Sequence, residues 1–147
     1  MPYATQTDLE REAGGKQKLI QLTDLNGTGE VDTTIVSDVI AEAESLVNSY
    51  LETRYAVPIA DEDVSDIVRR VTAAEAVYVL RDRREALHPS HQSRHEERIE
   101  WLDNVRRGVI SPGLDPRQLK SAQVSPEVGQ REGKAFSLTR AKFGGWT

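Results

Sequence analysis

The stretch from Asp32 to Pro58 constrains the fold most, because it has the pattern of one long amphipathic helix. Asp32 can cap its first turn, and Pro58 disfavours helical geometry at Val57, so the pattern predicts a helix from Asp32 to about Tyr55. A helix of this length needs other segments to cover its apolar face, and the rest of the chain must therefore pack against it. The apolar residues recur every three or four positions: Val36, Val39, Ile40, Ala43, Leu46, Val47, Tyr50 and Leu51.

Composition allows one small domain with a modest core. The chain has 147 residues, of which 37% are hydrophobic and 29% charged. It has no cysteine, which excludes disulfides, thiol nucleophiles and thiolate metal sites. No apolar run is long enough to span a bilayer, and the N-terminus lacks the pattern of a signal peptide. We therefore expect a soluble protein without a membrane partner.

Two short helical segments are predicted before the long helix. Thr7 and Glu10 have the spacing of a capping box, and Gly14 and Gly15 can end a helix of about two turns. Lys16–Thr23 holds enough apolar residues for a further helical turn. The run from Asp24 to Gly29 is rich in turn-forming residues and is predicted to be a loop.

Two more long helices are predicted after Pro58. Asp61 or Asp63 can cap a helix over residues 64–86, whose wide apolar face includes a Val71 that we expect to be buried.

The last of these helices follows Pro89, with Ser90 as its expected cap and Gly108 as its left-handed stop. Its apolar stripe is narrower and is made by Ile99, Leu102 and Val105, with Trp101 at one edge, as suits a helix on the outside of a bundle. The predicted fold is therefore all-α: a small antiparallel bundle of three main helices plus a short N-terminal helix.

The amino-acid composition changes after Gly108. Frequent prolines and glycines, with sparse apolar residues, predict an extended C-terminal arm over residues 109–147, beside a helical domain over residues 1–108. A strand-like segment near residues 134–142 could pair with a partner. The residues predicted to bind a partner are Arg131, Lys134, Phe136, Leu138, Arg140, Lys142, Phe143 and Trp146.

Charge is unevenly distributed along the chain. Residues 1–66 carry 14 acidic against 4 basic side chains, a net charge of −10, whereas residues 67–108 carry a net +2 and residues 109–147 a net +3. An acidic body repels DNA over much of its surface and offers the basic arm a docking site. An ordinary solvated surface is the alternative interpretation.

Two segments carry residues that could bind a metal ion. The loop after Asp24 places oxygen-bearing residues at several positions of a calcium-binding EF-hand, but Ile35 stands where the closing glutamate belongs. The spacing of His91 and His95 suits a metal ligand pair, yet Arg94 lies between them and the zinc-protease motif is incomplete. A capping turn and a solvated helix start are favoured instead. We expect no cofactor and no enzymatic activity.

Arg81, Arg83 and Arg84 form a cluster that could bind nucleic acid. The apolar stripes are too long for a compact helix-turn-helix, and the acidic first half would oppose duplex binding. Solvation of a helix end is the favoured interpretation of these arginines.

Several short motifs resemble a known family when they are taken in order. They are Tyr3-Ala4-Thr5 with Asp8-Leu9, Leu19 to Asp24, Tyr50-Leu51 and Arg54-Tyr55-x-Val57-Pro58-Ile59. In this order they are similar to the Mu-type phage neck proteins, which are head–tail connectors or adaptors. The resemblance covers about residues 1–110, and the tail matches the family only loosely.

The resemblance implies a structural virion protein that forms a ring, with twelve copies, beneath the portal of a tailed phage. It implies a portal protein above the ring, a tail or stopper protein below, and DNA passing through the channel without specific binding. The protein would be assembled in the bacterial cytoplasm and reside in the virion neck. Two alternatives remain: a helical DNA-binding module for phage packaging or regulation, and a metal-dependent enzyme that uses the histidines.

Overall fold

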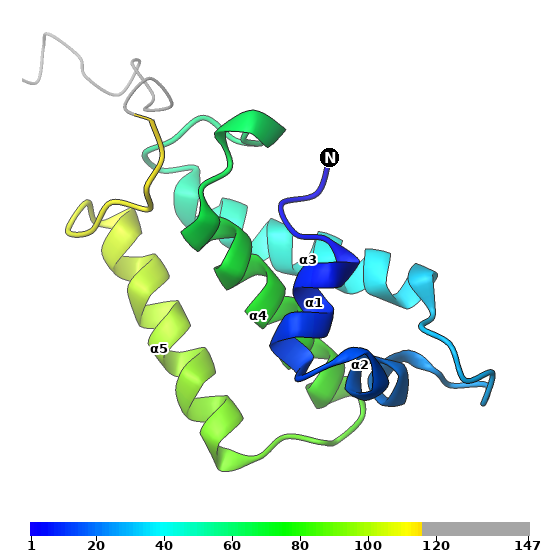
Figure 1. The fold of residues 1–147 in the computed structure, drawn as a ribbon. Helices are drawn as coiled ribbons and strands as arrows, with labels where there is room; N and C mark the ends of the chain where they lie inside the picture. The colour runs from blue at the N-terminus through cyan, green and yellow to red at the C-terminus, as the bar shows by residue number, and fades with distance from the viewer. Residues whose placement is uncertain (116–147) are drawn as a thin grey trace, which may run out of the picture.

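The structure is a computed structural model, and it describes residues 1–115. This part of the chain contains five α-helices, one short 3-10 helix and no β-strand (Figure 1). The all-helical prediction is therefore confirmed for the described residues. The elements are α1 (Gln6–Ala13), α2 (Lys16–Thr23), α3 (Thr33–Leu51), η1 (Asp61–Asp63), α4 (Asp66–Arg83) and α5 (Pro89–Arg106).

Helix α3 is the long amphipathic helix predicted from the sequence. The Asp32 carboxylate accepts hydrogen bonds from the N–H groups of Thr34 and Ile35, at 3.0 and 3.2 Å, as its predicted role as cap requires. The helix ends at Leu51, about one turn before the predicted end at Tyr55. It stops there because the chain turns so that Tyr55 and Ile59 can both enter the core.

Helix α4 is capped by Ser65 and not by Asp61 or Asp63, so this prediction was wrong. The Ser65 hydroxyl accepts from Val68 N–H at 3.2 Å and donates to the Pro112 carbonyl at 2.6 Å, and an ionised carboxylate could not donate in this way. Those acidic residues form η1 instead.

The caps of α1 and α5 also lie one or two residues from the predicted ones. Thr5 caps α1 and forms a capping box with Asp8, in place of Thr7 and Glu10. His88 caps α5 in place of Ser90. The His88 Nδ1 atom accepts a hydrogen bond from the Ser90 N–H at 3.2 Å. Pro89 fits the first position of α5 because no helical hydrogen bond is needed from that residue.

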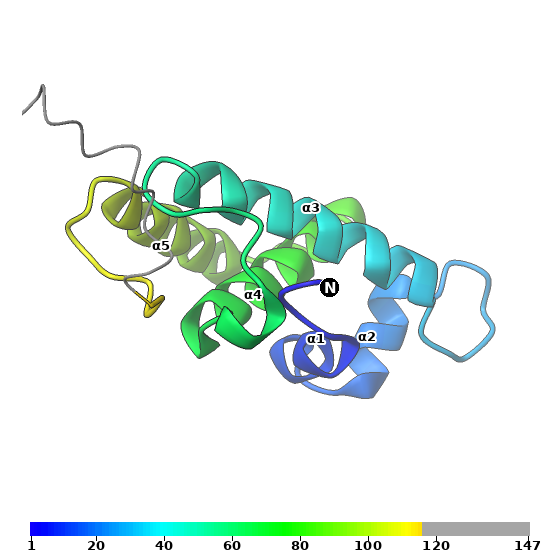
Figure 2. The ribbon, with the colours of Figure 1, turned by 90° about the horizontal axis from the view of Figure 1, so that it is seen from above.

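Two apolar clusters hold these helices together. The first joins α1 and α2 to α3 and α4 through residues such as Leu9, Leu19, Val39, Ala76 and Leu80. The second lies where α3, α4 and α5 meet, and it includes Tyr3, Leu51, Tyr55, Val68, Leu102 and Leu114. Figure 2 shows α3 crossing over α4 when the molecule is viewed from above.

Val71 departs from its predicted burial. It is only partly buried and packs against the second cluster from the side, because it lies on the edge of α4 that turns toward α5 and solvent. Val68, one helical turn earlier, is 1% exposed and occupies the core.

The chain continues to pack after α5 ends. Gly108 has a left-handed φ of +79°, as expected of the residue that stops this helix. Leu114, in the first part of the predicted arm, is buried in the second cluster. No helix within residues 1–115 has both the length and the apolar composition to cross a membrane.

Candidate protein interface

A groove of about 600 Å³ lies between α4 and α5. Helix α4 supplies Ile67, Arg70 and Val71 to its lining. Helix α5 supplies Arg94, Glu97, Arg98 and Trp101. Ile67 is 40% exposed and Val71 and Trp101 are half-buried, so the groove has an apolar floor that the described residues leave partly open to solvent.

The rim of the groove is mainly basic. Arg70 and Arg94 are exposed, and neither makes an ion pair within residues 1–115. Glu97 is the single acidic residue in the lining. An apolar floor with a basic rim is suited to an apolar side chain surrounded by acidic groups.

A buried carboxylate fixes one side of this groove. Glu75 is 2% exposed, and Arg98 Nε donates to its Oε2 at 3.1 Å. His95 Nδ1 lies 2.8 Å from the other carboxylate oxygen, without the alignment of a hydrogen bond. The His95 ring also stacks on Tyr78, with centroids 4.1 Å apart. Arg98 is thereby held in one position beside the groove.

His91 and His95, whose spacing suits a metal ligand pair, are engaged in separate contacts. His95 reaches Glu75 on α4, whereas His91 Nδ1 accepts from His88 N–H at 3.0 Å at the start of α5. Desolvation lowers the pKa of His91, and the nearby Arg81 charge adds to the shift. Within residues 1–115, no three His, Cys, Asp or Glu residues gather in a group that could hold a metal ion.

In the loop that resembles an EF-hand, the first carboxylate, Asp24, accepts hydrogen bonds from the loop's own backbone. Asp24 accepts from the N–H groups of Thr28 and Gly29, at 3.0 and 2.8 Å. These hydrogen bonds, that from Gly29 first, lower the pKa of Asp24. The geometry is that of a side chain ordering its own loop, the alternative favoured from the sequence.

The arginine cluster at the end of α4 also makes contacts within the fold. Arg81 donates to the Ala13 carbonyl at 3.5 Å and Arg84 to the Gln21 carbonyl at 3.1 Å, which ties α4 to α1 and α2. Arg83 pairs with Glu42 at 2.5 Å. All three arginines of the cluster are therefore engaged in contacts within the subunit.

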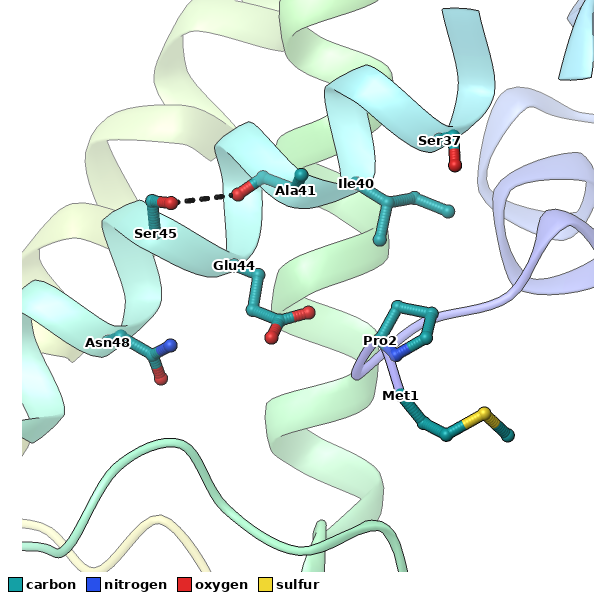
Figure 3. A pocket seen from close by; sticks show the side chains of 8 residues that line it. All are labelled: Met1, Pro2, Ser37, Ile40, Ala41, Glu44, Ser45 and Asn48. Carbon is teal, nitrogen blue, oxygen red and sulfur yellow. Dashed lines mark hydrogen bonds between the residues drawn. The ribbon is translucent and has the colours of Figure 1, made fainter. Parts of the chain in front are cut away.

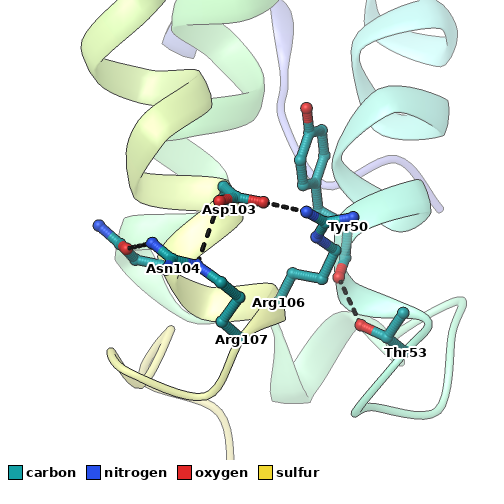
Figure 4. A network of polar contacts seen from close by, with 6 residues as sticks. All are labelled: Tyr50, Thr53, Asp103, Asn104, Arg106 and Arg107. Carbon is teal, nitrogen blue, oxygen red and sulfur yellow. Dashed lines mark hydrogen bonds and ion pairs between the residues drawn. The ribbon is translucent and has the colours of Figure 1, made fainter.

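A polar network joins the ends of α3 and α5 (Figure 4). Arg106 pairs with Asp103 and lies over the Tyr50 ring, 5.8 Å from its centroid. Arg107 also reaches Asp103, with 3.2 Å between Nε and Oδ2. The network sets the position of α5 against α3.

The N-terminus is clamped onto α3 by Tyr3. Its hydroxyl donates to Asn48 Oδ1 at 2.7 Å and accepts from Ile59 N–H at 2.8 Å, while its own N–H donates to Glu44 at 3.1 Å. Burial is the main cause that raises the pKa of this phenol. A neighbouring pocket of about 420 Å³ is lined by residues of α3 together with Met1 and Pro2. Figure 3 shows Pro2 facing Ile40 and Glu44 on α3.

The eight residues predicted to bind a partner all lie outside the described residues, so their contacts remain predictions: Arg131, Lys134, Phe136, Leu138, Arg140, Lys142, Phe143 and Trp146. The α4–α5 groove was not predicted. Its signal in the sequence is the apolar face of α4, which is wider than one covering helix requires.

Comparison with known proteins gives the class to which this helical chain belongs. Residues 3–129 match the family described as Bacteriophage Mu, Gp36, and the chain belongs to that family. It is therefore a phage protein, as the resemblance implied. It is similar to "Gene product J" of Escherichia phage Mu, with 25% identity over 146 residues, covering 92% of this chain and 99% of that relative.

Proposed function

We propose that this protein is a structural subunit of the phage neck, a head–tail connector that forms a ring under the portal. Membership of the Bacteriophage Mu, Gp36 family over residues 3–129 is the observation that carries the proposal. The proposed ring has twelve copies, with the portal protein above and a tail or stopper protein below. DNA passes through its channel without specific binding, and no cofactor or catalysis is required.

Charge and surface chemistry support this role. Residues 1–66 carry a net charge of −10, so an acidic surface facing the channel would not retain a passing polyanion. The α4–α5 groove offers an apolar floor for protein contact, and Arg81, Arg83 and Arg84 are engaged inside the subunit.

The proposal includes an arrangement of the subunit. The three long helices form the antiparallel bundle, and the extended C-terminal arm contacts the portal or a neighbouring subunit. In that contact Phe136 or Leu138 would occupy an apolar groove, while Lys134 and Arg140 would face acidic surface. The apolar anchors would provide most of the affinity, and the charges would mainly speed the encounter.

Deletion of the gene in its parent phage tests the proposal. We expect DNA-packed heads and separate tails that fail to join, with normal joining restored when the full-length chain is supplied in trans. Joined, infectious particles at the parental titre without the chain would refute the connector role.

A chain truncated after Asp115 tests the arm within the same assay. The cut follows Leu114, because this residue belongs to the core. We expect a folded subunit that fails to restore joining. Restoration equal to that of the full-length chain would show that the arm makes no essential contact.

A further inference from the structure

We propose that the loop between α2 and α3 inserts Leu25 into the α4–α5 groove of a second copy of this chain. The inference rests on the proposed ring and names the contact between its subunits. Leu25 is 62% exposed, so its apolar side chain is free to enter a groove on another molecule. It lies between α2 and α3 in an ordered loop, because Asp24 binds two of the loop's own N–H groups.

The loop and the groove are chemically complementary. Leu25 is flanked by Asp24 and followed by Glu30, and this loop carries no basic residue between Asp24 and Asp32. The groove offers the half-buried Val71 and Trp101 as an apolar floor, and Arg70 and Arg94 as a rim without internal ion pairs in residues 1–115. An apolar anchor would provide affinity, and the opposite charges would orient the approach.

Their positions fit a head-to-tail contact. The loop projects from one end of the described part, while α5 lies at the opposite side of the molecule (Figures 1 and 2). One subunit can therefore present its loop to one neighbour and its groove to another. Such a contact joins two different surfaces, and it forms a ring when the rotation between copies closes.

Other occupants fit the groove less well. The C-terminal segment over residues 109–147 carries a net charge of +3, the same sign as the Arg70 and Arg94 rim. Duplex DNA would meet the basic rim, but the apolar floor and Glu97 provide no phosphate contact.

Engineered cysteines test the contact directly, since the native chain has none. Asn26→Cys with Glu97→Cys places one thiol beside Leu25 and one in the groove. Under mild oxidation of the full-length chain we expect a ladder of disulfide-linked dimers, trimers and larger species. Each single variant should give no dimer above background, and so should Asn26→Cys paired with Glu12→Cys on α1. Equal cross-linking by the control pair, or by either single variant, would overturn the inference.

Association without cross-links provides the second test. We expect Leu25→Asp to weaken self-association at least tenfold in sedimentation analysis while leaving the melting temperature unchanged. Val109→Asp is the matched control, because Val109 is 68% exposed but does not line the groove. Glu30→Arg and Arg94→Glu should each weaken association, and combining them in one chain should restore it.

The two proposals can fail separately. A wild-type chain that stays monomeric at high concentration, or a Leu25→Asp variant that associates normally, would overturn the loop contact. The connector role would still be judged by particle assembly. If Arg70→Glu with Arg94→Glu abolished DNA retention but left self-association unchanged, the groove would be a DNA surface and the inference would be wrong.

Discussion

Tyr3 shows how one side chain joins three distant parts of the chain. It is 1% exposed, and its hydroxyl links Asn48 on α3 to the backbone of Ile59. Tyr3→Phe keeps the ring but leaves the Ile59 N–H without its partner. We expect a loss of about 1–3 kcal/mol in the free energy of unfolding, measured by urea denaturation. Tyr50→Phe is the control, because the Tyr50 hydroxyl makes no hydrogen bond within residues 1–115. An equal loss of unfolding free energy in Tyr50→Phe would contradict the stabilising role of the Tyr3 hydroxyl.

The same phenol predicts a dependence of stability on pH. Burial raises the pKa of Tyr3 in the folded state, whereas the unfolded chain ionises it near pH 10. The folded state then holds a proton that the unfolded state has lost, so stability should fall as the pH rises above about 10. Tyr3→Phe should flatten this decline in denaturation curves recorded between pH 8 and 11. An unchanged slope would show that Tyr3 is not its cause.

Glu75 is the buried charge on which the groove depends. Arg98, with a side chain 17% exposed, would lose its buried partner in Glu75→Ala. We expect the free energy of unfolding to fall by about 3 kcal/mol. This is near the lower end of the range for breaking a buried ion pair, because Arg98 retains some contact with water. Glu75→Gln keeps the shape and one acceptor and should lose less. Thermal melts against Glu100→Ala, which alters an exposed residue of α5, provide the comparison. Equal melting temperatures for Glu75→Ala and Glu100→Ala would contradict this role.

At the level of elements, α4 has two apolar faces with different roles. Val68 faces the core and Val71 lines the groove, so the same substitution should have different consequences. We expect Val68→Asp to cost about 4 kcal/mol or more, enough to unfold a marginally stable domain. Val71→Asp should leave a folded protein, destabilised by about 1 kcal/mol, with impaired self-association. Circular dichroism during heating separates them, and similar melting temperatures would contradict this division of α4.

Apolar periodicity predicted the long helices, but contacts between distant residues decided their ends. Asp61, Asp63 and Ser65 all permit a cap before α4, and Ser65 also bonds Pro112, which is 47 positions away. The role of Tyr3 in the core could not be predicted from local sequence, since its partners lie 45 and 56 positions along the chain. Periodicity showed that α4 is broadly apolar, but it could not show which part α5 leaves uncovered. For this reason Val71 was predicted to be buried and the groove was missed.

At the scale of the whole molecule, uneven charge and an open groove are suited to repeated contacts between copies. The acidic loop between α2 and α3 lies at the opposite side of the described part from α5, which supplies Arg94 to the groove, and this placement suits head-to-tail assembly (Figure 1). The helices that form these surfaces are fixed by internal contacts such as the Arg84 bond to Gln21. A rigid subunit of this kind can bind its neighbours with little loss of conformational entropy.

Cryo-electron microscopy of the parent phage tests the connector role most directly. We predict a ring between the portal and the tail in which each subunit fits the five-helix fold of residues 1–115. Particles labelled through a tag on this chain should carry the label at that junction. A neck with no density of this fold, together with label absent from the virion or placed elsewhere on it, would contradict the connector assignment.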